Sequence, residues 1–248
     1  MAIRNFKSVT IDFILKIILI SGFAILIYGI FSYWRIQGLI RESRVLIQEA
    51  HPYTRHVSDT APKALFIGDS TGVGVGSNRK EDSVAGRFAL AYPSLNIDNL
   101  SKSGKKTRDI VSTMENISGR PYAYLILQIG ANDIVSFSNT DTLRSDIKKV
   151  LLEAKRISEN VFLMTSGSVG NAPLLPRPFA FVWERQTRVV RKIFKEEADK
   201  SGARYVDLFM EKDKDPFALD PIRYHAPDLF HPNKEGYGIW YKELEKVL

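Results

Sequence analysis

Hydrophobic residues fall into two patterns along this chain, one long run near the N-terminus and a series of short runs after residue 62. The short runs alternate with amphipathic stretches of helical period. We predict strands at 64–68, 95–100, 123–130, 160–166 and 203–209, and helices at 82–92, 107–117, 140–158, 183–201 and 235–247. Nearly continuous apolar strands require burial on both faces. The pattern therefore predicts a three-layer α/β fold with a five-stranded parallel sheet.

The long run, residues 13–34, is apolar except for Lys16 and ends in Tyr33 and Trp34. A helix needs roughly 20 residues to cross a bilayer core, and this run provides them. A cleaved signal peptide has a shorter core and a small-residue cleavage site, and a buried core helix needs a large domain around it. We therefore predict an uncleaved transmembrane anchor.

Four segments follow from these patterns. We predict an N-terminal tail at 1–12, the anchor at 13–34, a juxtamembrane linker at 35–62 that includes a helix at about 36–50, and a folded domain at 63–248. Basic residues stand on both sides of the anchor, so the positive-inside rule does not fix its orientation.

Composition and charge exclude several classes of function. The sequence has no cysteine, which excludes disulfides, thiolate metal sites and cysteine nucleophiles. The net charge is +7, but the basic residues are interspersed with acidic ones, as in FKEEADK at 194–200. That mixture is typical of solvated helix faces, so we predict no nucleic-acid partner. Attraction to an anionic surface such as lipid headgroups stays open.

Chemically capable residues follow the predicted strands, where an open parallel sheet binds its ligands. They are Asp69 and Ser70 after the first strand, Gly104 after the second, Asn132 and Asp133 after the third, and Asp228 and His231 ahead of the last helix. We therefore expect one site at the carboxyl edge of the sheet.

A phosphate-binding loop is one interpretation of the glycines after Ser70. Gly72, Gly74 and Gly76 give GxGxG and not GxGxxG, and the stretch 101–107 lacks the first glycine of a Walker loop because position 99 is Asn. Both patterns are therefore weak evidence for a nucleotide.

A serine nucleophile is the alternative. A serine hydroxyl needs a neighbouring base, and histidine suits that role near neutral pH. Asp228 precedes His231 by three residues and could hold its Nδ1–H, leaving Nε2 for Ser70. The Ser70 and Gly104 N–H groups and the Asn132 amide could stabilise an oxyanion. Taken singly, each of these residues also fits a turn, a cap or a polar loop.

The ordered set of four blocks resembles the SGNH (GDSL-type) hydrolase family. The blocks are Gly68-Asp69-Ser70, Gly104 in NLSKSG, Asn132 in GAND, and Asp228 and His231 in DLFHP, within about residues 63–248. The first block reads GDST in place of GDSL. The resemblance implies a flavodoxin-like sheet and serine esterase or lipase-type chemistry without metal or cofactor. It implies Ser70 as nucleophile, His231 as base, Asp228 as its orienting partner, and an oxyanion hole formed by Ser70, Gly104 and Asn132.

The segment 167–183 is long, apolar and proline-stiffened, and leaves the fourth strand on the side of the expected site. Long loops often carry binding function, although an ordinary packed connection explains the segment equally well. We predict substrate-binding residues here, namely Leu174, Leu175, Arg177, Phe179 and Phe181.

The expected activity is hydrolysis of acyl or acetyl esters on lipid-like or acylated envelope molecules. Deacetylation of a polysaccharide is an alternative substrate choice. Two other functions stay open, an O-acyltransferase that uses the same triad and a non-catalytic, membrane-tethered binding module. Envelope esters lie outside the cytoplasmic membrane, so we expect the N-terminus inside and the catalytic domain on the extracytoplasmic side.

Overall fold

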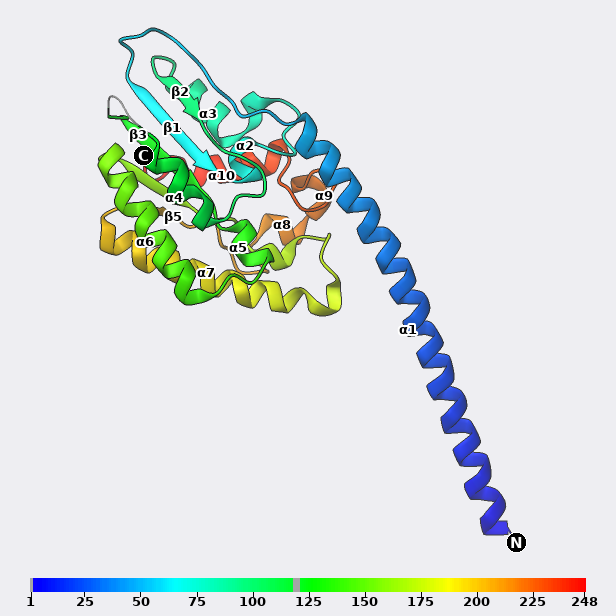
Figure 1. The fold of residues 1–248 in the computed structure, drawn as a ribbon. Coiled ribbons are helices and arrows are strands. Elements are labelled where there is room, and N and C mark those ends of the chain that lie inside the picture. Colours follow the sequence, from blue (N-terminus) through cyan, green and yellow to red (C-terminus); the bar gives the residue numbers. More distant parts are fainter. Residues whose placement is uncertain (1, 118–120) are drawn as a thin grey trace. The chain divides into compact units, whose positions relative to one another are not determined.

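The computed structural model describes residues 2–117 and 121–248, with side chains from Phe13 onward. The chain divides into two compact units, Met1–Arg41 and Glu42–Leu248. Figure 1 shows the course of the chain through both.

Helix α1 runs without a break from Ala2 to Glu49 and so covers the predicted tail, anchor and juxtamembrane helix. From Phe13 on it is long and apolar enough to cross a membrane, with a mean hydropathy of 2.4 over its most apolar window and no burial of that window. A signal sequence meets the same criterion of length and composition, so the helix alone leaves both assignments open.

Five parallel strands form the sheet of the second unit in the order β2-β1-β3-β4-β5. The strands are β1 (Lys63–Gly68), β2 (Asn96–Asn99), β3 (Tyr124–Gln128), β4 (Val161–Met164) and β5 (Arg204–Val206). The predicted α/β class and five-stranded parallel sheet are confirmed. Strand β1 ends at Gly68 as predicted, whereas β2, β3, β4 and β5 end before the apolar runs that predict them, because the residues there enter turns.

Helices cover both faces of this sheet (Figure 1). They are α2 (Ser70–Val73), α3 (Val84–Ala91), α4 (Thr107–Glu115), α5 (Ala131–Val135), α6 (Thr140–Ile157), α7 (Ala180–Ser201), α8 (Pro216–Leu219), α9 (Pro221–Tyr224) and α10 (Lys234–Glu245), with 3-10 turns at Lys80–Asp82, Val169–Asn171 and Arg177–Phe179. Helix α7 begins three residues earlier than predicted, so Phe181 lies in its first turn.

Alternate residues of the strands feed two separate hydrophobic cores. Leu65 and Leu127 pack with residues of α4, α6 and α7 on one face. Phe66 and Ile126 pack with residues of α3 and α10 on the other. Because side chains alternate along a strand, a sheet covered on both faces needs apolar residues at successive positions. This is the physical origin of the continuous apolar runs in the sequence.

Residues ahead of β1 also pack against the domain. Tyr53 is buried in the second of the two cores. The guanidinium of Arg55 donates to the carbonyl oxygens of Ala89 at 2.7 Å and Tyr92 at 2.6 Å, at the end of α3. These carbonyls have no partner within the helix, and a cation beside them is favourable. The segment predicted as a linker thus contributes contacts to the fold, while its boundaries stay a prediction.

Candidate active site

The turn that presents Ser70 depends on the residues just before it. A Cβ placed on Gly68 would come within 2.3 Å of the Gln128 carbonyl oxygen, so the close approach of β1 to β3 requires glycine here. Asp69 then caps α2, because its Oδ1 accepts from the backbone N–H of Thr71 at 2.9 Å and from its hydroxyl at 2.8 Å. Ser70 is therefore the first residue of a helical turn, where a backbone N–H is free of intrahelical bonds.

Ser70, His231 and Asp228 form a continuous chain of hydrogen bonds. The Nε2 atom of His231 lies 2.9 Å from Ser70 Oγ, and its Nδ1 atom lies 2.5 Å from Asp228 Oδ2. A carboxylate only accepts, so Nδ1 carries the proton and Nε2 offers a lone pair to the serine hydroxyl. All three side chains are buried. The structure thus brings these three residues together, while their catalytic roles stay a prediction.

The loop between Asp228 and His231 is held by its own backbone. Asp228 Oδ1 accepts from the N–H groups of Phe230 at 3.1 Å and His231 at 3.0 Å. Between them Leu229 has a φ of 55°, a left-handed conformation that is strained for a side chain with a Cβ. Its carbonyl accepts from the N–H of Leu174 at 3.1 Å. The loop therefore has little freedom to turn the imidazole away from Ser70.

Hydrogen bonding keeps Asp228 ionised despite its burial. Burial raises the pKa of this carboxyl, but the hydrogen bond from the His231 ring, the charge of that ring and the two backbone donors together hold the pKa below its ordinary value. A charged Asp228 at neutral pH fixes the tautomer of His231 and stabilises its protonated form.

The other two predicted blocks lie on turns after β2 and β3. Gly104 is exposed, its φ is 81°, and a Cβ added there would meet nothing within 4 Å. The Asn132 amide donates to the carbonyl of Lys105, the residue after Gly104, at 2.9 Å. One of its two N–H groups is thus used to hold this loop, and the second is left for a ligand.

Two buried polar residues to which sequence analysis gave no role of their own fix these turns. Asp133 Oδ2 accepts from the backbone N–H of Thr107 at 2.9 Å and from its hydroxyl at 2.7 Å, which joins the start of α4 to α5. The Asn99 amide donates to the Gly72 carbonyl at 3.1 Å, which joins the end of β2 to α2. Both residues lie within the predicted blocks, Asn99 in NLSKSG and Asp133 in GAND, and that position was the signal available in the sequence.

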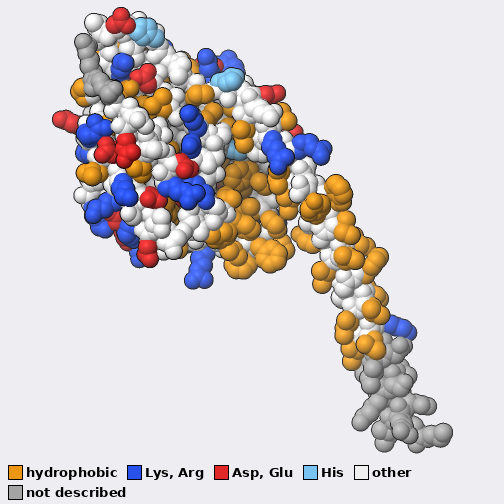
Figure 2. Space-filling view, viewed as in Figure 1, with side chains coloured by type: hydrophobic (Ala, Val, Ile, Leu, Met, Phe, Trp, Pro, Cys, Tyr) orange, Lys and Arg blue, Asp and Glu red, His pale blue; other side chains and the backbone are white. Residues whose placement is uncertain are grey.

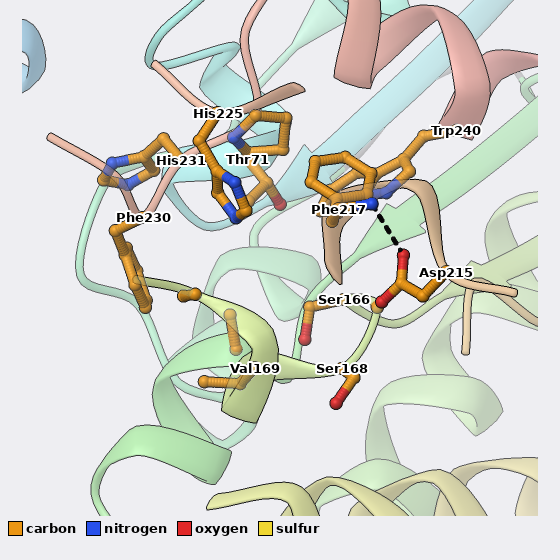
Figure 3. Close-up of a pocket in the computed structure, with 14 residues that line it drawn as sticks. Thr71, Ser166, Ser168, Val169, Asp215, Phe217, His225, Phe230, His231 and Trp240 are labelled. Carbon is orange, nitrogen blue, oxygen red and sulfur yellow. Dashed lines mark hydrogen bonds between the residues drawn. The ribbon is translucent and has the colours of Figure 1, made fainter. Parts of the chain in front are cut away.

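A cavity of about 50 Å³ lies beside His231. Its lining comes from α2, α5, the segment after β4, α8 with its N-cap, the loop before α10, and α10 itself. It comprises Thr71, Ala131, Ser166, Gly167, Ser168, Val169, Ala172, Asp215, Phe217, His225, Phe230, His231, Pro232 and Trp240. Figure 3 shows the labelled members of this set, with a hydrogen bond of 3.0 Å from the backbone N–H of Phe217 to the carboxylate of Asp215. Aromatic and aliphatic groups dominate, which is typical of a small ligand site.

His225 is the second histidine of this site. Its Nδ1 lies 3.0 Å from the Pro221 carbonyl oxygen, which only accepts, so Nδ1 carries the proton and Nε2 is an acceptor. Burial lowers the pKa of this imidazole, against the opposing effect of the Pro221 hydrogen bond. A neutral acceptor therefore lines the cavity next to His231 (Figure 3).

The predicted substrate-binding residues lie elsewhere. Leu175 is buried in a hydrophobic core, Leu174 is half-buried, and Arg177, Phe179 and Phe181 are exposed. Within the described residues, the lining of the cavity includes none of the five. Substrate contact by these residues stays a prediction.

Comparison with known proteins gives the family. Residues 66–239, more than half of the chain, match the GDSL-like Lipase/Acylhydrolase family. The chain belongs to this family, and the resemblance to SGNH (GDSL-type) hydrolases is confirmed. It is accordingly a hydrolase of carboxylic esters. A comparison with curated proteins found no match.

Solved structures share the fold. A member of the lipolytic G-D-S-L family from Veillonella parvula is 17% identical with a TM-score of 0.61, covering 76% of this chain and 98% of its own. An acetylxylan esterase from Geobacillus stearothermophilus is 20% identical with a TM-score of 0.57, covering 77% and 95%. A phospholipase A1 from Streptomyces albidoflavus is 14% identical with a TM-score of 0.55, covering 76% and 100%. At these identities the likeness is one of fold.

Asp69 offers a stability test of the nucleophile turn. Burial raises its carboxyl pKa from 3.8 to about 6, against the hydrogen bonds from Thr71. The folded state thus favours the protonated carboxyl over the charged carboxylate. The stability that protonation contributes is fully present below pH 4 and is lost as pH rises through about 6. Asp69→Asn keeps the acceptor for Thr71 without the charge. We expect it to stabilise the protein by roughly 2–3 kcal/mol above pH 6, and by much less near pH 4.

Urea unfolding of the full chain in detergent micelles across this pH range measures the effect. Asp59→Asn, at a fully solvated carboxyl, is the control and should change stability little at any pH. A gain for Asp69→Asn that is the same at low and high pH would show that charge burial is not its cause.

Proposed function

We propose that the protein is a serine esterase in which Ser70 is the nucleophile, His231 the general base and Asp228 the residue that orients the imidazole. The observation that carries this proposal is the 2.9 Å approach of His231 Nε2 to Ser70 Oγ, with Nδ1 held by Asp228. Family membership supplies the ester bond as the target.

The reaction would proceed in two halves. Ser70 Oγ attacks the ester carbonyl carbon while its proton moves to His231 Nε2. The tetrahedral intermediate collapses, the bond to the alcohol oxygen breaks, and His231 returns the proton to that leaving group. A water then attacks the acyl-serine with His231 again as base, releasing the acid and restoring the serine hydroxyl. The charge of Asp228 favours the imidazolium in both halves.

The negative charge of the intermediate would lie on the carbonyl oxygen. We assign its donors to the backbone N–H of Ser70, the backbone N–H of Gly104 and the side-chain amide of Asn132. The left-handed φ of 81° at Gly104 supports this, since glycine adopts that conformation readily and its backbone can come close to a ligand. The Lys105 carbonyl that holds the Asn132 amide supports it further, because a donor fixed in advance needs no reorientation.

The proposed substrates are acyl or acetyl esters on lipid-like or acylated envelope molecules. The cavity beside His231 is mainly apolar and of about 50 Å³, which favours a short acyl group over a long chain. Transfer of the acyl group to a sugar or lipid hydroxyl is an alternative outcome of the same acyl-enzyme. A non-catalytic binding module is the third possibility, and a serine already bonded to its base argues against it.

Substitution of the nucleophile tests the chemistry. We expect Ser70→Ala to lower the hydrolysis of p-nitrophenyl acetate by roughly 10⁴-fold or more, with an unchanged circular dichroism spectrum. Labelling by a fluorophosphonate should be lost together with activity. Ser112→Ala, at an exposed hydroxyl on α4, is the matched control. Hydrolysis that survives in Ser70→Ala would assign the nucleophile to another residue.

The oxyanion assignment has its own test. We expect Asn132→Ala to lower kcat by roughly 10²–10³ with little change in KM, because the amide acts on the transition state more than on the bound ester. Asn116→Ala, at an exposed amide that bonds Ser112, serves as control. A rise in KM at constant kcat would instead show that Asn132 binds the ground state.

We further propose that the anchor spans residues 13–34, between a tail at 1–12 and a linker at 35–62, and that the domain at 63–248 lies on the extracytoplasmic side. Protease added to intact spheroplasts should then degrade the domain, because it is outside the membrane. In lysed spheroplasts the protease reaches both sides of the membrane. They provide the control that the protease can cleave the domain. Full protection in intact spheroplasts would place the domain in the cytoplasm.

A further inference from the structure

An exposed aromatic surface lies beside the candidate active site. Phe137 is 46% exposed, Phe179 58% and Phe181 66%. The ring of Phe137 meets that of Trp183 with centroids 5.9 Å apart, which joins the end of α5 to the start of α7. Figure 2 shows hydrophobic side chains gathered over α5 and the segment that leads into α7. We refer to Phe137, Phe179, Phe181 and Trp183 as the aromatic edge.

The size of the edge is comparable to that of the largest apolar patch on a typical soluble monomer, and such patches are often functional. With about 200 Å² for a phenylalanine, its three phenylalanines expose on the order of 300 Å² of aromatic area. Contiguous apolar patches of this size on soluble proteins often mark interaction sites. The exposed leucines Leu90 and Leu152 lie on α3 and α6 and carry no such inference.

The backbone at Phe137 supplies independent evidence. Its φ is 52°, a left-handed conformation that glycine or asparagine adopts far more readily than a bulky aromatic residue. The residue is strained and yet leaves almost half of its side chain in solvent. Burial within the domain therefore does not compensate for this strain. A partner that covered the ring would compensate for it by burying the exposed part of the side chain.

Charge identifies the kind of partner. Arg177 and Arg185 flank Phe179 and Phe181, both are exposed, and neither forms an ion pair with the described residues. Glu184, the acid within this stretch, is paired with Arg188 at 2.9 Å. Exposed aromatic rings interleaved with unpaired arginines match an anionic bilayer surface, where rings enter the boundary of the acyl chains and guanidinium groups bind phosphates.

The edge is connected to the catalytic turns. Leu174, just ahead of it, bonds the Leu229 carbonyl in the loop that holds His231. Phe137 follows Asn132 by five residues, and its neighbour Ser138 donates to Asp133 at 2.8 Å. A surface that holds the edge would therefore also lie close to the mouth of the site.

We propose that the aromatic edge docks on an anionic lipid bilayer, with Phe179 and Phe181 inserted at the headgroup boundary and Arg177 and Arg185 on phosphate groups. The apolar helix from Phe13 onward favours this partner, since an inserted helix keeps the domain at high effective concentration near lipid. The inference that the bilayer then delivers the ester to Ser70 rests on the function proposed above. Docking of the aromatic edge does not depend on that function.

The sequence lacks cysteine, so a single introduced thiol can carry a nitroxide at one chosen position. The full chain would be labelled at Phe181→Cys and, as control, at Leu152→Cys on α6, where the native side chains are 66% and 70% exposed. Both would be placed in nanodiscs of phosphatidylcholine with phosphatidylglycerol, one copy to a disc. Collisions with oxygen and with a water-soluble nickel chelate report the depth of each label.

We expect the label at 181 to favour oxygen and lose access to nickel, while the label at 152 stays accessible to nickel. Replacing both Arg177 and Arg185 by Gln should lower the docked-to-undocked ratio about fivefold per arginine in these discs. Lys148→Gln with Lys149→Gln, on exposed positions of α6, should leave the ratio unchanged.

Equal nickel access at 181 and 152 would overturn the proposal. So would protection at 181 that appears only with several copies in a disc, because the partner would then be a second chain. Repeating the measurement in Ser70→Ala separates the two proposals: docking should persist there, whatever that variant shows about catalysis.

Discussion

The hydrogen bond from Ser70 to His231 is the interaction on which the proposed chemistry depends. It joins residues 161 positions apart, at the end of β1 and just ahead of α10. Neither side chain can act alone, since the hydroxyl is a weak nucleophile and the imidazole needs an acceptor for its second nitrogen. The parallel sheet brings the two loops together because its strands all end at one edge.

Several backbone constraints keep that contact in place. The capped turn at Asp69, the left-handed Leu229 and the bond from Asn132 to the Lys105 carbonyl each fix one loop of the site. Each of these arrangements is locally unfavourable or uses a buried polar group. They persist because the surrounding core, packed on both faces of the sheet, determines where the loops begin and end.

Under the proposed function and docking, the aromatic edge and the cavity would divide substrate recognition between two regions. The cavity next to His231 is small, whereas Phe179 and Phe181 are solvent-exposed. An esterase docked on lipid would use the first for the acyl group and the second for the surface that carries the ester. The strained Phe137 belongs to the second region and is joined through Ser138 to Asp133 in the first turn of α5.

The sequence by itself determined the α/β class, the number of strands and the four blocks of the family, because alternating apolar runs and short polar turns are local properties of a chain. It also identified Ser70, Asp228 and His231 as candidates. Only the tertiary structure decided that these three bond to each other, that His225 lines the cavity and that Phe179 and Phe181 face solvent. Those outcomes depend on loops distant in sequence, and no local pattern records which of them meet.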